Sequence, residues 1–158
     1  MVINMDVKII NPFLQSTVNL FQTMFSLEIK PNPPYVLENF LSHRWEITGL
    51  VGITGITKGV VAIRMHHLLV NKILEKSGVE VADDDERYET INAMVGELIN
   101  IISGNAISGM PYPDIDISVP MIVQGDNHRI AWPKIAPVIG IPFPTTWGIF
   151  EVQVCFQE

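Results

Sequence analysis

The run Ile91-Asn-Ala-Met-Val-Gly-Glu-Leu-Ile-Asn-Ile-Ile-Ser-Gly-Asn-Ala106 has the clearest periodicity in the chain. Its apolar side chains recur at a spacing close to 3.6 residues, which predicts an amphipathic helix. We expect one broad stripe of this helix to be buried: Ile91, Met94, Val95, Leu98, Ile101, Ile102 and Ala106. The opposite side collects small and polar residues: Ala93, Gly96, Glu97, Asn100, Ser103 and Gly104.

Two functional side chains therefore stand among very small ones. Glu97 and Asn100 are three residues apart, about one turn, and project in the same direction. Each glycine inside a helix costs roughly 1 kcal/mol relative to alanine, so Gly96 and Gly104 indicate a close approach of another backbone. That backbone belongs either to a neighbouring element of the protein or to a partner docking from outside. We favour the partner.

Length and composition limit the class of protein. The chain has 158 residues, which predicts a single domain over residues 1–158. The net charge of −7, without a Lys/Arg cluster, argues against binding nucleic acid through phosphates. Cys155 is the single cysteine, so a disulfide framework is excluded. Without a signal-like start or a long apolar run, we expect a soluble, cytoplasmic protein.

The first half of the chain predicts two helices and three strands. Asn11-Pro12 has the form of a helix start, with Asn as N-cap and Pro at the first helical position, for a helix reaching residue 25. Strands are expected at residues 45–49, 51–57 and 60–65, with a hairpin turn at Lys58-Gly59. A second amphipathic helix over residues 66–77 ends at Gly78.

The second half predicts the central helix and more strands. Asp83-Asp-Asp-Glu86 lacks the alternating spacing of a calcium loop, so these acids are better read as first-turn residues that complement the helix dipole. Strands are expected at residues 115–122, 138–141 and 148–156, with a turn at 125–127. Pro142 and Pro144 indicate an irregular or edge segment. The flat apolar last strand is a candidate for edge pairing in a dimer.

A faint internal repeat relates the two halves. Placing Asn19 over Asn100 aligns residues 13–21 with residues 94–102. The aligned first copy has Ser16 where the second has Glu97, so it keeps the amide and lacks the acid. This alignment suggests a pseudo-twofold duplication.

Familiar catalytic motifs are missing from the sequence. There is no Gly-x-Ser-x-Gly elbow, Walker loop or dinucleotide glycine fingerprint. His66 and His67 diverge by about 100° on a helix, so the two cannot chelate one metal together, and no metal site is expected. Cys155 in an apolar strand is interpreted as an inert core thiol.

Glu97 and Asn100 remain, with two interpretations. They are either ordinary polar residues on a solvated helix face or a pair suited to phosphoryl hydrolysis, which mainly needs an in-line water and charge stabilisation. A carboxamide can accept a hydrogen bond from water and donate one to a phosphoryl oxygen. A carboxylate can anchor a cationic group of a partner, and Ala93, Gly96 and Gly104 would leave that partner room.

The segment Gly96-Glu97-Leu-Ile-Asn100-Ile-Ile-Ser-Gly104-Asn resembles the Glu-x-x-Asn signature helix of the CheC/CheX/FliY chemotaxis phosphatases. Asn11-Pro-Phe-Leu with the Asn19 helix, Gly52 and Gly59, and the closing strand resemble the CheX branch. The resemblance implies an α+β fold of two long helices packed on antiparallel sheet, pseudo-twofold duplicated, that forms homodimers through sheet edges.

The same resemblance implies an activity: hydrolysis of the aspartyl-phosphate of a CheY-like response regulator. Glu97 would pair with a lysine of the regulator, and Asn100 would orient the attacking water. The chain would need no cofactor of its own, because Mg²⁺ would belong to the regulator.

Two positions depart from the family pattern. Ala93 stands where the family has Asp or Ser, and the proline expected about 22 residues after Asn100 has only Pro120 as a near candidate. Ala93 favours a rival interpretation, in which the chain is a non-catalytic adaptor that docks a response regulator with the same helix. A scaffold that only dimerises is the third possibility.

Overall fold

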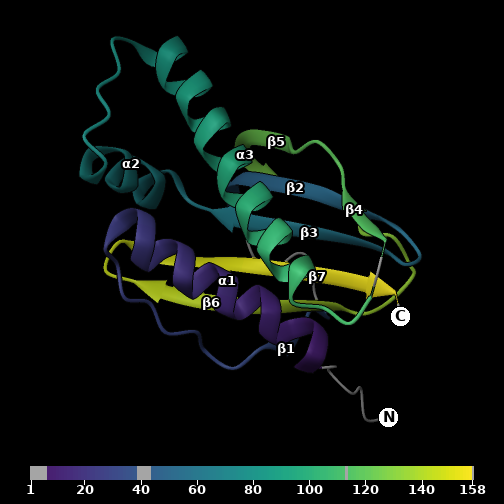
Figure 1. Ribbon diagram of the computed structural model, residues 1–158. Coiled ribbons are helices and arrows are strands. Elements are labelled where there is room, and N and C mark those ends of the chain that lie inside the picture. The colour runs from purple at the N-terminus through teal and green to yellow at the C-terminus, as the bar shows by residue number, and fades with distance from the viewer. Residues whose placement is uncertain (1–6, 39–43, 113, 158) are drawn as a thin grey trace.

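The computed structural model describes residues 7–38, 44–112 and 114–157 (Figure 1). The predicted domain also includes residues 1–6, 39–43, 113 and 158, which lie outside the described parts. The described helices are α1 (Val7–Phe25), α2 (His67–Lys76) and α3 (Asp84–Ser108). The described strands are β1 (Tyr35–Val36), β2 (Trp45–Gly55), β3 (Lys58–Met65), β4 (Ile115–Ile117), β5 (Met121–His128), β6 (Val138–Thr145) and β7 (Gly148–Gln157).

The strands form one antiparallel sheet, and the helices pack on it. The strand order is β1-β6-β7-β3-β2-β4, with β5 also paired to β2. Helices α1 and α3 lie side by side across the same face of the sheet (Figure 1). The predicted α+β class is therefore confirmed, with three helices on an antiparallel sheet. None of these helices has both the length and the hydropathy needed to cross a bilayer, within the residues described.

The buried side of α3 matches the predicted apolar stripe, with two additions, because Ile99 and Ser103 are also fully buried. Its fully buried members include Val95, Leu98 and Ile102, while Met94 and Ile101 are half-buried. Ser103 was expected on the outer side, but it is completely buried. The reason is geometric: Ser103 lies between the buried positions Ile99 and Ala106 on the helix surface, so it turns inward with them.

Replacing Ser103 with alanine is expected to raise the free energy of unfolding by about 1 kcal/mol. The Ser103 hydroxyl is buried without a hydrogen-bond partner among the described residues, and an unsatisfied buried hydroxyl costs about 1–3 kcal/mol. Urea unfolding measures the change. Ser108→Ala is the matched control, because that hydroxyl is exposed and already bonds the Gly104 carbonyl. A loss of stability in Ser103→Ala would contradict the prediction.

Helix α3 lies close to the sheet at Gly49 of β2. A Cβ at Gly49 would lie 2.8 Å from Val95 Cγ1 and 3.3 Å from Ile122 Cδ1. Real Cβ atoms do not approach this closely, and a valine has little rotamer freedom on a helix with which to move away. The missing side chain at Gly49 therefore lets α3 lie directly on β2.

Gly49→Ala is consequently expected to lower the free energy of unfolding by about 1–3 kcal/mol, the usual cost of overpacking a core. Thermal and urea unfolding would measure the loss. Gly52→Ala on the same strand is the control, because its Cβ would lie 3.5 Å from Ser118 Oγ, an ordinary contact. Equal stability of the two variants would contradict the close approach of α3.

The first helix begins earlier than predicted. Pro12 lies inside α1, which runs from Val7. Ile9 and Ile10 are buried beside the rest of the core, and this burial stabilises the extra turn although a proline removes one backbone hydrogen bond. Farther along, Phe21 stacks on Phe150 of β7 with ring centroids 4.6 Å apart, which holds α1 on the sheet.

The first predicted hairpin has a different turn. Residues 45–49 and 51–57 were expected to be two strands, but β2 is continuous from Trp45 to Gly55. The turn lies at Ile56-Thr57 rather than at Lys58-Gly59, which belongs to β3. Gly55 explains the shift, because its φ of +119° ends the strand in a conformation that other residues rarely adopt.

The segment after α3 also differs from the prediction. The strand expected at residues 115–122 is divided into β4 and the start of β5, and β5 continues through the turn expected at residues 125–127. Its register against β2 shifts there, because Ile47 pairs with Gln124 and Trp45 with His128. Residues 125–127 are thus part of a β-bulge.

The last strand is not an edge. β7 lies between β6 and β3 in the interior of the sheet, so it cannot provide the expected dimer edge. Both of its faces are buried, since Trp132 and Ile135 pack with Cys155 on the side away from α1. The strand expected at residues 138–141 extends through Pro142 and Pro144 as part of β6, so these prolines do not mark an irregular segment. Both lie beyond the two positions where β6 pairs with β1.

Candidate functional site on the outer face of helix α3

Two side-chain hydrogen bonds cap the N-terminus of α3, the helix that carries the outer face. The Asp83 side chain accepts a hydrogen bond from the Glu86 N–H at 2.8 Å, and the Glu86 carboxylate accepts one from the Ala82 N–H at 2.8 Å. These reciprocal bonds satisfy backbone donors that a helix end leaves unpaired. The acidic residues therefore lie at the N-cap and in the first turn of α3, as expected.

Glu97 and Asn100 are both exposed on this outer face, one helical turn apart. Leu98 and Ile99 between them are fully buried, which fixes the direction in which the two polar side chains point. Within the described parts of the chain, neither the Glu97 carboxylate nor the Asn100 carboxamide has a hydrogen-bond or ion-pair partner. Both groups are therefore available to a molecule that approaches α3 from solvent.

The small residues around the pair differ in their surroundings. Ala93 is exposed, and a Cβ added to Gly104 would meet no atom within 4 Å. A Cβ at Gly96 would lie 3.6 Å from Ile122 Cδ1 and 3.8 Å from Pro120 Cβ. A neighbouring element of the protein thus lies beside Gly96, whereas Gly104 faces open space.

An apolar rim that the sequence did not single out flanks this face. Val119 is 88% exposed and Met121 is 61% exposed, on either side of the Pro120 that lies near Gly96. Isolated exposed apolar residues are common, but two beside an uncovered helix face fit a docking surface. In the sequence, this rim corresponds to Val119-Pro120-Met121, a proline between two large apolar residues just after a short strand.

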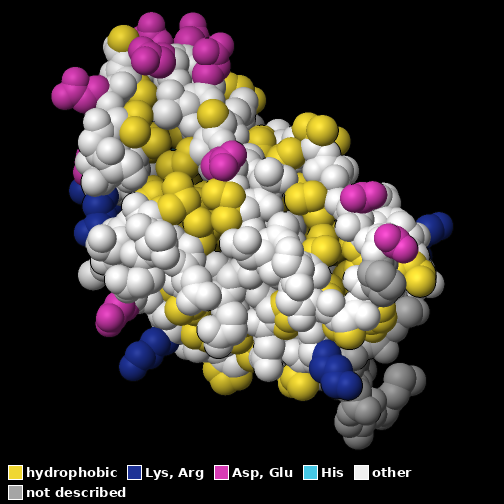
Figure 2. Space-filling view, in the orientation of Figure 1, with side chains coloured by type: hydrophobic (Ala, Val, Ile, Leu, Met, Phe, Trp, Pro, Cys, Tyr) yellow, Lys and Arg dark blue, Asp and Glu magenta, His cyan; other side chains and the backbone are white. Residues whose placement is uncertain are grey.

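Charge is distributed unevenly along α3. Acidic side chains gather at its N-terminal end, while hydrophobic and uncharged side chains cover most of its middle (Figure 2). Glu97 is the only charged residue between residues 90 and 108. Arg87, the only basic residue of α3, is the fourth residue of the helix and donates a hydrogen bond to Asn71 Oδ1 at 2.8 Å. A cation that approaches the middle of α3 therefore meets one carboxylate.

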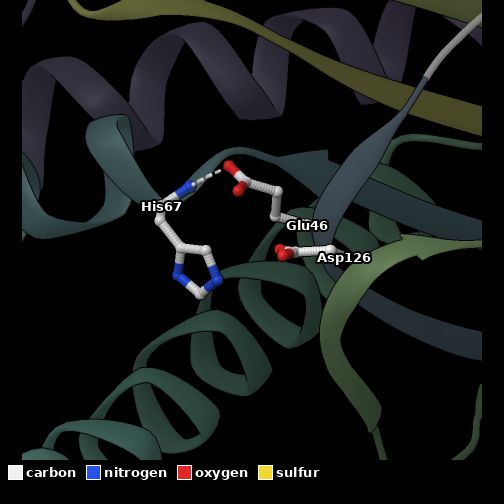
Figure 3. Close-up of side chains that lie close together, drawn as sticks. All are labelled: Glu46, His67 and Asp126. Carbon is white, nitrogen blue, oxygen red and sulfur yellow. Dashed lines mark hydrogen bonds between the residues drawn. The ribbon is translucent and has the colours of Figure 1, made fainter.

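A second group of polar side chains lies at the junction of β2, α2 and β5. Glu46, His67 and Asp126 each offer a ligand atom, and these atoms lie within 4.8 Å of one another (Figure 3). Partial burial raises the pKa of Glu46, but the His67 N–H bond and the nearby His66 and His67 rings outweigh it, so the pKa is lowered. The sequence did not predict this group, because its members are far apart in the chain and residues 125–127 were interpreted as a turn.

Comparisons with known proteins agree with this architecture. The sequence model of the family Chemotaxis phosphatase CheX matches residues 47–144. A CheC-like superfamily protein from Shewanella sp. PV-4 is 32% identical, with 98% of this chain and 100% of that chain covered and a TM-score of 0.84. The chemotaxis protein CheX from Desulfovibrio desulfuricans is 29% identical, with 95% and 99% covered and a TM-score of 0.82.

A third solved structure contains a partner. It is the CheX–CheY–BeF₃–Mg²⁺ complex from Borrelia burgdorferi, which is 25% identical, with 97% of this chain and 100% of that chain covered and a TM-score of 0.81. No curated protein matches the chain.

Proposed function

Since the chain belongs to the CheX family of chemotaxis phosphatases, we propose that it hydrolyses the aspartyl-phosphate of a CheY-like response regulator. The observation that carries this proposal is the Glu97–Asn100 pair, exposed one turn apart on α3 without partners in the described chain. The solved complex of a relative with CheY and Mg²⁺ supports a regulator of this type as the partner.

Asn100 provides the group that this reaction needs. A water oxygen attacks phosphorus in line as the bond to the aspartyl oxygen breaks, which leaves inorganic phosphate and a free aspartate carboxylate. The Asn100 carbonyl accepts a hydrogen bond from that water, and its N–H₂ donates to a phosphoryl oxygen. An amide is suited to this position because a carboxylate would repel the phosphoryl group.

Glu97 acts as the anchor. Its carboxylate pairs with a lysine of the regulator, a charge-assisted contact that fixes the register of α3 on the regulator's active centre. The chain needs no cofactor of its own in this scheme, because Mg²⁺ comes with the regulator. The sole charge on this part of α3 favours a cationic partner group, and the resemblance to the family implies that this group is a lysine.

The surroundings of the pair are suited to a docking protein. Gly104 and Ala93 present no bulk above the helix, so a loop of the regulator can approach the α3 backbone. Val119 and Met121 offer apolar contact at the rim of the same face. The regulator would supply the phosphorylated pocket, and α3 would insert two side chains into it.

A non-catalytic adaptor is the second candidate function. Ala93 favours it, because this exposed position has no hydrogen-bonding group where the resemblance leads us to expect Asp or Ser. An adaptor would bind the regulator through the same face and leave the lifetime of its phosphoryl group unchanged.

The two candidates are separated by following the decay of a phosphorylated CheY-type regulator with and without the purified chain. Faster decay supports the phosphatase. Binding to the activated regulator with an unchanged decay rate supports the adaptor. If the chain neither binds the regulator nor speeds its decay, both candidate functions are overturned.

Two further expectations remain proposals. We propose that the chain forms a homodimer through a sheet edge, for which β4 and β5 at one side and β1 at the other are the available strands in the described sheet. We also interpret α1 as a degenerate copy of α3, with exposed Asn19 in the place of Asn100.

A further inference from the structure

Three elements that are distant in sequence bring potential metal ligands together away from the Glu97–Asn100 pair. Glu46 comes from β2, His67 is the first residue of α2, and Asp126 comes from the bulged part of β5. Their ligand atoms lie within 4.8 Å of one another. Figure 3 shows the imidazole and the two carboxylates arranged around a common space.

Helix capping accounts for only part of this arrangement. His66 is the N-cap residue of α2 but makes no side-chain cap bond. Glu46 Oε1 instead accepts a hydrogen bond from the His67 N–H at 2.9 Å and lies 3.3 Å from His66 Nδ1. The cap explains why Glu46 points toward α2. It gives no role to the His67 imidazole or to Asp126.

The β5 bulge is what brings Asp126 to this place. Between two paired positions, β5 advances four residues where β2 advances two. His128 fixes the bulge from both sides, because its Nδ1 lies 2.7 Å from the Gly125 carbonyl and its Nε2 lies 2.6 Å from Thr48 Oγ1. A bulge re-aims a side chain, and here it directs Asp126 toward α2.

The side chains of His67 and Asp126 are not held by bonds to other described residues. Among the residues described, neither the His67 imidazole nor the Asp126 carboxylate has a hydrogen-bond or ion-pair partner. Two carboxylates that face one space repel each other unless a cation lies between them. The group therefore has the charge and the free ligand atoms that a divalent cation requires.

We propose that Glu46, His67 and Asp126 bind a divalent transition metal ion of the Zn²⁺ class. One imidazole nitrogen with two carboxylates suits Zn²⁺ and similar ions, whereas Ca²⁺ and Mg²⁺ prefer oxygen ligands alone. Three protein ligands leave coordination positions for water or a group of a partner. The ion would tie β2, α2 and β5 together.

The spacing of the ligands fits this proposal after a small adjustment. Ligand atoms on a tetrahedral Zn²⁺ with bonds near 2.0 Å lie about 3.3 Å apart. Asp126 is exposed, so its side chain can rotate inward by the missing distance. His67 can bind without losing the cap, because the cap uses its backbone N–H.

Calorimetric titration of the chain with Zn²⁺ alone tests the site, with Mg²⁺ titrated in parallel. We expect one Zn²⁺ per chain, a higher thermal midpoint with Zn²⁺, and little response to Mg²⁺. Asp126→Asn and His67→Ala should each weaken Zn²⁺ binding at least tenfold, an effect of about 1.4 kcal/mol or more. Circular dichroism confirms that each variant is folded.

Asp85→Asn is the matched control, because Asp85 is an exposed acid in the first turn of α3. Its Zn²⁺ affinity should equal that of the wild type. The proposal is overturned if the wild type does not bind Zn²⁺, or if Asp126→Asn and His67→Ala bind it as tightly as the wild type. Regulator dephosphorylation does not enter this test, so its outcome is independent of the proposed function.

Discussion

Replacing Asn100 with alanine is expected to slow stimulated dephosphorylation of the regulator by about 100-fold, or about 2.7 kcal/mol of transition-state stabilisation. The loss should fall on kcat, because the carboxamide positions the attacking water and bonds the phosphoryl oxygen during the reaction, while docking depends on other contacts. Asn100 is exposed, so the variant should fold normally. The measurement is the decay of the phosphorylated regulator at saturating concentrations of each protein, beside a binding isotherm.

Asn105→Ala provides the matched control for Asn100. Asn105 is also an exposed asparagine of α3, and its replacement should leave both the decay rate and the affinity close to those of the wild type. Asn100→Asp should be as inactive as Asn100→Ala, because a carboxylate repels the phosphoryl group. An Asn100→Ala protein that retains the full rate would remove the carboxamide from the reaction.

Replacing Glu97 with alanine is expected to weaken binding of the activated regulator by roughly 10- to 100-fold, since hydrogen bonds to charged groups contribute about 1.5–3 kcal/mol. The decay rate at saturation should change much less, because Glu97 holds the partner and Asn100 positions the water. Binding to a beryllofluoride-activated regulator, with no turnover, gives the affinity directly. Added salt should narrow the difference between the variant and the wild type.

Glu89→Ala is the control for loss of a negative charge from α3, because Glu89 is exposed on the same helix about two turns away. Its affinity should stay near that of the wild type. If Glu97→Ala bound normally and lost its activity at saturation, the carboxylate would belong to the chemistry and the anchoring role would be wrong.

The exposure of Glu97 and Asn100 was predictable because the information for it is local. Helical periodicity alone predicted that Leu98 faces the core, and Glu97 and Asn100 must then face away from it. Ser103 was misplaced because the prediction assigned polar side chains to the exposed side of the helix. A serine side chain is small enough to fit in the core. The helix itself was predictable, while the contents of its buried stripe depended on packing.

Features that depend on strand pairing were not predictable. Gly125 and Asp126 read as a turn in isolation, and only the partner strand β2 shows that they form a bulge. The last strand looked like an edge because it is flat and apolar, but β6 and β3 pair with it on both sides. Both errors concern contacts between residues that are distant in the chain.

The position of a bound regulator tests the central claim most directly. The measurement is the structure of this chain in complex with a beryllofluoride-activated, Mg²⁺-bound CheY-type regulator. We predict that α3 enters the phosphorylation pocket, with the Asn100 carboxamide at hydrogen-bonding distance from the in-line water position and Glu97 paired with a lysine. A regulator bound elsewhere on the chain, with Asn100 remote from the beryllofluoride, would contradict the account.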